Sequence, residues 1–316
     1  MGEHFLILIL TAVAVGVLSW FLLPGPWARM LLWVGRKASG LRSFNVSAGG
    51  LRWHFLRGGR GVTLVTIHGF GADADNWQRV SPIIKDRFEI IAPDLIGFGS
   101  SDPGHALSFT IDDQVERLWE WLNQLDVGPC VMAGSSMGGW IASRFAQKFP
   151  ESVTGLWLLA PLGVEDCEPG ELLTNIDTGQ SNPLSISSPA DFEHKVFRPM
   201  FSNPPYLPRP LKTHYMQRAI RRSRASQRMF TAVHASTPPL EAIIQELDIP
   251  ILIQWGDKDR AVHVSGADRL RNEIRQGEVI IQDNVGHLPM LEIPGPTARQ
   301  FMQFAERYGL AGSDPV

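Results

Sequence analysis

One short stretch restricts the fold of this chain more than any other, and it reads Gly134-Ser135-Ser136-Met137-Gly138. An apolar run precedes it and a helical pattern follows it, as the motif G-x-S-x-G requires where it turns a strand into a helix. Such a turn is tight, so the positions two before and two after its centre need glycine. Ser136 meets this condition, whereas Ser135 has alanine two positions before it. We therefore predict that Ser136 sits on a sharp turn, with its hydroxyl above a sheet and beside the free N–H groups of a helix N-terminus.

Short apolar runs alternate with helical patterns on both sides of this turn. We expect strands over residues 62–67, 90–93, 130–133, 153–159, 249–255 and 278–282, and helices over 111–125, 140–149, 264–274 and 297–308. This order predicts an α/β fold with a mostly parallel sheet flanked by helices. Residues 163–245 break the alternation and hold ten of the 23 prolines. We expect them to form a cap inserted into a core made of residues 61–162 and 246–316.

Residues 5–23 contain no charged side chain. As a helix this run would rise by about 28 Å, which matches the hydrocarbon thickness of a bilayer. A cleaved signal peptide fits less well, because no Lys or Arg precedes the run and the A-x-A match at residues 12–14 lies inside it. We predict a single-pass transmembrane anchor over residues 1–27, with a juxtamembrane segment and the first strands over 28–60. The small residues Ala12 and Gly16 suggest a homodimer as a hypothesis.

The charges after the anchor bear on its orientation. Residues 29–60 contain seven basic and no acidic side chains, and Trp27 and Trp33 suit a membrane interface. The positive-inside rule places the large domain in the cytoplasm, although a polybasic stretch also binds anionic lipid on whichever side it faces. The formal net charge of −3 gives no reason to expect nucleic acid as a partner.

A serine nucleophile needs a base, and the base needs a carboxylate to fix its tautomer. In the chain order expected after Ser136, the acid comes before the histidine. Asp259 follows the strand expected over 249–255, and His287 follows the strand expected over 278–282. Carboxyl ends of parallel strands share one edge of a sheet, so these side chains should meet Ser136 there. Asp257 is the alternative acid, with a turn-capping role as its other interpretation.

The remaining part of such a site is a pair of donors for a developing oxyanion. The stretch His68-Gly69-Phe70-Gly71 follows the strand expected over 62–67. From this position the amide of Phe70 can meet the amide of Met137, the residue after the nucleophile. We expect His68 to be a loop residue bound by backbone groups. The loop that begins at Asp94 is expected to serve a turn rather than catalysis.

The expected cap is basic and apolar at once. Residues 195–240 carry nine Lys and Arg side chains and no acidic one. The apolar side chains among them are candidates to line a tunnel for an acyl chain, with a basic rim around it. A solvated helix face is the other interpretation. The candidates are Phe197, Met200, Phe201, Tyr206, Leu207, Met216, Met229 and Phe230.

Taken together, the motifs HGFG, PDLIGFGSSD, GSSMGG, WGDKD and GH resemble the α/β-hydrolase fold family in their order over residues 60–310. The elbow, the stretch WGDKDRAVHVSGADRL and the anchor are most similar to the membrane-anchored monoacylglycerol lipase and phospholipase branch. The resemblance implies Ser136 as nucleophile, Asp259 as acid, His287 as base, and Phe70 and Met137 as oxyanion donors. It also implies a bilayer-bound enzyme that cleaves acyl esters of glycerolipids without a metal or cofactor.

Two rival functions remain at this point. The first is a hydrolase of a soluble metabolite on the same fold, either a carboxylesterase or a carbon–carbon bond hydrolase, which uses a similar GxSMGG elbow. The anchor speaks against it, since a soluble substrate gives no reason to tether an enzyme. The second is an inactive membrane-bound scaffold, and the intact set of Ser136, Asp259 and His287 disfavours it.

Overall fold

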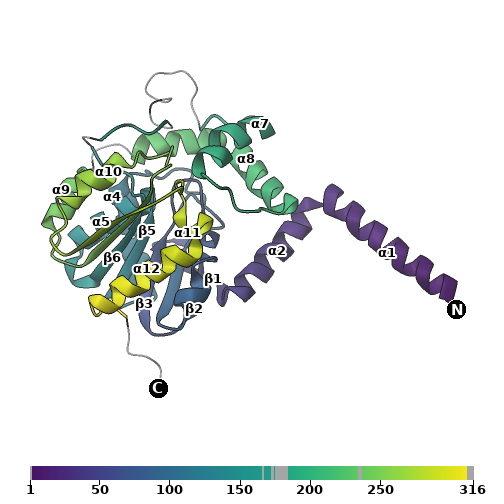
Figure 1. The fold of residues 1–316 in the computed structure, drawn as a ribbon, viewed down its shortest axis with the longest axis horizontal. Helices are drawn as coiled ribbons and strands as arrows, with labels where there is room; N and C mark the ends of the chain where they lie inside the picture. Colours follow the sequence, from purple (N-terminus) through teal and green to yellow (C-terminus); the bar gives the residue numbers. More distant parts are fainter. Residues whose placement is uncertain (1, 166, 172–173, 175–183, 234–236, 312–316) are drawn as a thin grey trace.

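The computed structural model describes residues 2–165, 167–171, 174, 184–233 and 237–311. Eight strands form one sheet in the order β1-β2-β4-β3-β5-β6-β7-β8 (Figure 1). The hairpin of β1 and β2 and the pair of β2 and β4 are antiparallel, and every other pair is parallel. The strands are β1 (Leu41–Ala48), β2 (Leu51–Gly59), β3 (Val62–Ile67), β4 (Phe88–Pro93), β5 (Cys130–Ser135), β6 (Val153–Leu159), β7 (Ile251–Gly256) and β8 (Gly277–Gln282).

The central strands are apolar on both faces because helices cover both. Met132 of β5 packs into a cluster with α4 (Ile111–Gln124), α5 (Met137–Lys148), α9 (Leu240–Glu246) and α10 (Ser265–Arg271). Its neighbour Val131 points to the other face, where it joins α3 (Ser81–Ile84) and α12 (Pro294–Arg307). This confirms the predicted α/β class with a mostly parallel sheet.

The segment between β6 and β7 lies at one end of the sheet, as the positions of α7 and α8 in Figure 1 illustrate. Its helices are α7 (Pro189–Asp191), the π-helix η3 (Phe192–Phe197), the short η4 (Arg198–Met200) and the long α8 (Arg209–Val233). α9 follows, and its buried residues Leu240, Ile243 and Ile244 belong to the core of the α/β domain. The predicted cap boundary at residue 245 therefore falls inside α9.

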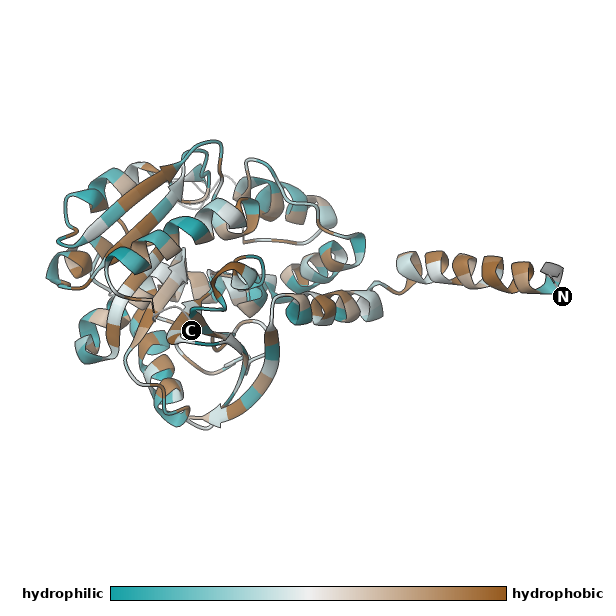
Figure 2. Ribbon diagram, turned by 60° about the horizontal axis from the view of Figure 1, so that its bottom comes forward, coloured by the Kyte–Doolittle hydropathy of each residue, from teal (hydrophilic) through white to brown (hydrophobic). Residues whose placement is uncertain are grey.

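The N-terminal region contains two helices where the sequence predicts one. α1 (Gly2–Leu22) extends away from the rest of the protein and is apolar along its length (Figure 2). Residues 4–22 are long and apolar enough to cross a membrane, and their side chains are not buried. A second helix, α2 (Pro24–Ala38), starts directly after a break at Leu23. Proline suits the first turn of a helix, so the prolines that end α1 also start α2.

α2 packs against the domain rather than continuing into solvent. It contacts α8 and β1, and Ala28 on it is fully buried. Trp27 donates a hydrogen bond from Nε1 to Ser19 Oγ at 3.1 Å, which links α2 back to α1. The predicted boundary between anchor and juxtamembrane segment, at residue 27, thus lies within α2.

Candidate active site

Ser136 lies on a strained turn between β5 and α5. Its φ of 54° and ψ of −121° are rare for a residue with a side chain. The flanking glycines explain how the backbone holds this shape. A Cβ on Gly134 would lie 2.2 Å from Gly138 O, and a Cβ on Gly138 would lie 2.3 Å from Ile67 O. Any side chain at these two positions would push α5 away from the sheet.

His287 lies against Asp259, and both side chains are buried. Nδ1 of His287 is 2.7 Å from Oδ2 of Asp259. The carboxylate also accepts hydrogen bonds from the amides of Ala261 and Val262 at Oδ1, at 2.8 and 3.0 Å, and from Trp255 Nε1 at Oδ2. Asp259 is the acceptor in all of these contacts, so Nδ1 of His287 donates to it and Nε2 is left as the acceptor that faces away from the carboxylate.

Asp257 lies elsewhere. Its Oδ1 accepts from the amide of Val285 at 3.3 Å, and its Oδ2 pairs with Lys258 near the surface. It caps the loop before His287, which is the alternative role considered for it above. The structure thus brings Asp259, and not Asp257, to the imidazole.

The loop after β3 passes close to the serine. A Cβ on Gly69 would lie 3.2 Å from the Cβ of Ser136, so a side chain here would make a tight contact with the serine. His68 holds this loop, with Nδ1 2.7 Å from Gly69 O and Nε2 accepting from the amide of Leu95 at 3.0 Å. Burial lowers the pKa of His68, which keeps the ring neutral as these two bonds require. This confirms the expected structural role of His68.

One cavity of about 490 Å³ contains Ser136, His287 and Phe70 in its wall. Most of the wall is apolar and comes from the segment between β6 and β7. Seven of the eight residues proposed for a tunnel line it, namely Phe197, Met200, Phe201, Tyr206, Leu207, Met229 and Phe230. Met216 instead lines a second cavity, of about 400 Å³, on the other side of Leu207. Met216 shares its side of α8 with Lys212 and Thr213, and tertiary packing rather than composition decides which side of this helix faces Ser136.

Sequence reasoning missed a part of the cavity wall. Leu31, Leu32 and Gly35 of α2 line it, although they precede the first strand. The available signal was the helical spacing of apolar residues after Pro24, a proline at the first position of a helix.

The nine basic residues of the cap do not form one rim. Lys195, Arg198 and Lys212 pair with Asp191 or Glu193, which lie just before the basic window. Arg218 and Arg222 turn inward to core loops. Arg209, Arg221, Arg224 and Arg228 are exposed. Lys195, Arg218 and Arg222 line the cavity of Ser136, so a basic rim stays a prediction for part of the run, whereas the acidic partners Asp191 and Glu193 lie just before its window.

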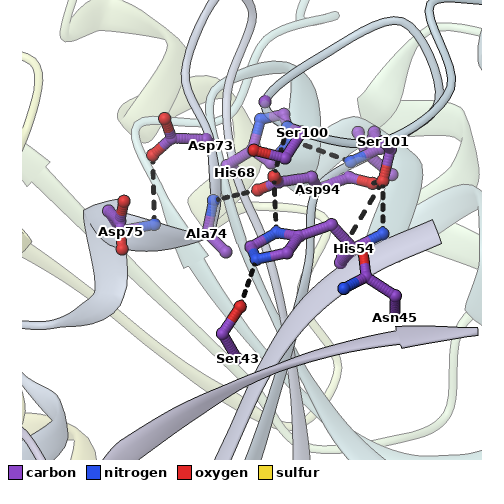
Figure 3. A network of polar contacts seen from close by, with 12 residues as sticks. Ser43, Asn45, His54, His68, Asp73, Ala74, Asp75, Asp94, Ser100 and Ser101 are labelled. Carbon is purple, nitrogen blue, oxygen red and sulfur yellow. Dashed lines mark hydrogen bonds and ion pairs between the residues drawn. The ribbon is translucent and has the colours of Figure 1, made fainter. Parts of the chain in front are cut away.

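Figure 3 shows a second group of serine, histidine and aspartate, Ser43, His54 and Asp94. Nε2 of His54 is 2.6 Å from Ser43 Oγ, and Nδ1 is 2.8 Å from Asp94 Oδ2. Ser43 is on the edge strand β1 and not at a helix N-terminus, and the residues lining the cavity of Ser136 include none of the three. Asp94 also accepts from the amides of Ala74 and Ser100. This group therefore holds loops together, as expected for the loop that begins at Asp94.

Comparisons with known proteins agree with this geometry. Residues 62–294 match the family described as alpha/beta hydrolase fold. The chain belongs to this family. It is 31% identical to Lipase 3 of Moraxella sp. over 78% of each chain, and 24% identical to human monoacylglycerol lipase ABHD6 over 91% of this chain and 89% of that one. A solved structure of a membrane phospholipase A, a bacterial virulence factor, superposes with a TM-score of 0.87 at 33% identity and covers 97% of this chain and 99% of that one.

These matches confirm the resemblance drawn from the motifs. The chain is an ester hydrolase of the α/β-hydrolase fold, as its sequence predicts.

The two acid candidates give a direct test of the site. We expect Asp259→Asn to lower kcat for a short-chain ester by about 10⁴-fold, because an amide at this position favours the wrong tautomer of His287. Asp257→Asn removes a loop cap and should leave kcat nearly unchanged. Steady-state kinetics of both variants, with thermal unfolding as a check of folding, measure the difference. A large loss in Asp257→Asn with an active Asp259→Asn would reverse the assignment.

Proposed function

We propose that this protein is a membrane-anchored serine hydrolase that cleaves acyl esters of glycerolipids, meaning monoacylglycerols, lysophospholipids or phospholipids. The observation that carries the proposal is the shared cavity. Ser136 and His287, with Asp259 bound behind the imidazole, open into an apolar space of about 490 Å³. A cavity of this size and character suits an acyl chain better than a charged metabolite.

In the proposed mechanism, Nε2 of His287 takes the proton of Ser136 while the hydroxyl oxygen attacks the acyl carbonyl. The amides of Phe70 and Met137 bind the oxyanion of the tetrahedral intermediate. The imidazolium, stabilised by Asp259, then protonates the leaving alcohol. In the second half, His287 activates a water molecule that releases the fatty acid and restores Ser136.

The relatives support a lipid substrate. Those compared above are called lipase, monoacylglycerol lipase and phospholipase A. The hydrolase of 2-hydroxy-6-oxo-6-phenylhexa-2,4-dienoate, a soluble metabolite, has a similar fold at 22% identity with a TM-score of 0.73. That likeness concerns the fold alone, so the metabolite hydrolase stays the second candidate without an observation of its own.

The N-terminal helices support action at a bilayer. α1 would span the membrane, and Met30, Trp33 and Val34 of α2 expose apolar side chains next to it. The guanidinium of Arg209 in α8 lies 4.5 Å from the ring centre of Phe21 in α1, as a basic residue at a membrane interface would. Because α2 also forms part of the cavity wall, an acyl chain would have a short path from the bilayer to Ser136. We retain the cytoplasmic orientation and the homodimer as hypotheses.

A fluorophosphonate probe tests the enzyme itself. Wild type should become covalently labelled at Ser136, and Ser136→Ala should lose labelling and nearly all ester hydrolysis, by about 10⁴-fold or more. Mass spectrometry of the labelled peptide locates the adduct. A panel of monoacylglycerol, lysophospholipid, phospholipid and a vinylogous diketone then separates the lipid hydrolase from the carbon–carbon bond hydrolase. Turnover of the diketone alone would reject the proposal.

Removing residues 1–22 tests the anchor while it leaves α2 intact. The triad and the cavity lie outside the deleted part, so we expect unchanged turnover of a soluble short-chain ester. Activity on vesicles should fall by about 10²-fold, because tethering supplies local concentration without new contacts. Equal activity on vesicles with and without residues 1–22 would show that the anchor only localises the protein and does not assist catalysis.

Three of the exposed arginines of α8, Arg221, Arg224 and Arg228, give a test of binding to anionic lipid. Each basic side chain near a charged leaflet contributes about 1 kcal/mol, screened over about 8 Å at physiological salt. We expect activity on anionic vesicles to fall as salt rises, and the triple change of Arg221, Arg224 and Arg228 to Gln to flatten this dependence. Turnover of a soluble ester should not respond to either. The same salt slope in wild type and the triple variant would assign these arginines to a solvated face.

A further inference from the structure

The loop that carries Phe70 continues through two aspartates, Asp73 and Asp75, which are both buried. Each aspartate binds an arginine from a helix outside the α/β core. Asp73 caps the short helix η1 (Ala74–Trp77) by accepting from the amide of Asp75 at 3.1 Å. The loop from Gly69 to this cap spans only a few residues, so both carboxylates lie close to Phe70 along the chain.

The first arginine comes from α2. Arg36 donates hydrogen bonds to both carboxylate oxygens of Asp75, from Nε to Oδ1 at 2.7 Å and from Nη2 to Oδ2 at 2.8 Å. Gln78 adds a third bond to Oδ1 at 2.5 Å. Burial disfavours the charged guanidinium, but the bonds and the charge of Asp75 raise the pKa of Arg36 above its ordinary value. The pair is thus a planar, bidentate ion pair, which fixes the orientation of the Asp75 carboxylate as well as its distance from Arg36.

The second arginine comes from α8. Arg218 binds Asp73 Oδ2 through Nη1, and its Nη2 lies 3.5 Å from Gly71 O. The side chains of this pair are 15% and 9% exposed, so water screens it weakly. Phe230, also on α8, packs its ring edge-to-face against Phe70 at 5.2 Å between ring centres. The same helix therefore contacts the loop on both sides of Gly71.

A third contact fixes the loop to the core. Asp94 at the end of β4 accepts from the amide of Ala74 at 2.8 Å, and His54 of β2 holds that carboxylate from behind (Figure 3). Asp94 thus ties η1 to the sheet, whereas Arg36 ties it to α2 and Arg218 ties it to α8.

We propose that Arg36 and Arg218 are positioning residues for the oxyanion loop, so that the docking of α2 and α8 sets the orientation of the Phe70 amide. This rests on the proposed role of Phe70 as an oxyanion donor. Such a donor works only when it is held within about 0.5 Å of its place before the reaction. A hydrophobic pair would pack these helices as firmly as a buried ion pair does, since desolvation offsets most of the attraction. The two ion pairs are instead suited to fix the orientation of the loop. Efficient turnover then requires that α2, the helix next to the membrane anchor, is docked on the domain.

The experiment uses the full chain in detergent, with a soluble short-chain ester as substrate and an alkyl boronic acid as mimic of the tetrahedral oxyanion. We expect Arg36→Gln to lower kcat by about 10- to 100-fold and to weaken boronate binding by the same factor, with KM nearly unchanged. Arg36→Lys keeps the positive charge but cannot form the two parallel hydrogen bonds, so its kcat and boronate affinity should lie between those of wild type and Arg36→Gln. Arg218→Gln should behave like Arg36→Gln. Arg29→Gln and Gln217→Ala alter exposed side chains on the same two helices and should match wild type.

A merely structural role gives a different result. In that case the melting temperature falls while kcat and boronate affinity per folded molecule stay at the wild-type values, and the proposal is overturned. If Arg36→Gln does not fold, kcat and boronate affinity of Arg36→Lys decide between the positioning role and the structural role. Inactive Ser136→Ala together with a fully active Arg36→Gln would reject this inference alone and leave the proposed function standing.

Discussion

The close backbone contact between the elbow and the end of β3 is the constraint on which the site depends. Gly138 has no Cβ, and one there would lie 2.3 Å from Ile67 O; a Cβ on Gly69 would lie 3.2 Å from the Cβ of Ser136, a tight contact. These contacts set the start of α5 against the loop after β3. Gly69 and Ser136 are therefore neighbours through backbone packing alone, and the proposed nucleophile and oxyanion donors belong to these two segments.

The segment between β6 and β7 is fastened to each loop at this edge by polar contacts. Arg222 binds the carbonyls of Gly97 and Gly99, and the amide of His287 donates to Met200 O at 2.9 Å. Arg260, next to Asp259, pairs with Glu171. The segment is thus more than a cover for an apolar cavity. A shift of it relative to the core would disturb the loops that carry Asp259, His287 and Phe70 together.

The sequence predicts the sheet and the place of the site because both follow from local patterns. The runs at residues 62–67 and 153–159 coincide with β3 and β6, and chain order alone places Asp259 and His287 on the edge that carries Ser136. The cap is harder, since Met216 and Arg222 take their directions from tertiary contacts. The π-helical turn over residues 192–197 also follows no regular period, so side-chain directions beyond it cannot be counted from the sequence.

The helix α2 shows why the anchor and the enzyme cannot be separated at the boundary that sequence suggests. Trp27, Leu31 and Gly35 follow each other at four-residue spacing and so share one side of the helix. The first contacts α1, the second lines the cavity, and the third packs on Gln78 beside the pair of Arg36 and Asp75. The family match begins only at residue 62. A chain cut there would lose β1, β2, the part of the cavity wall that comes from α2, and Arg36, the partner of Asp75.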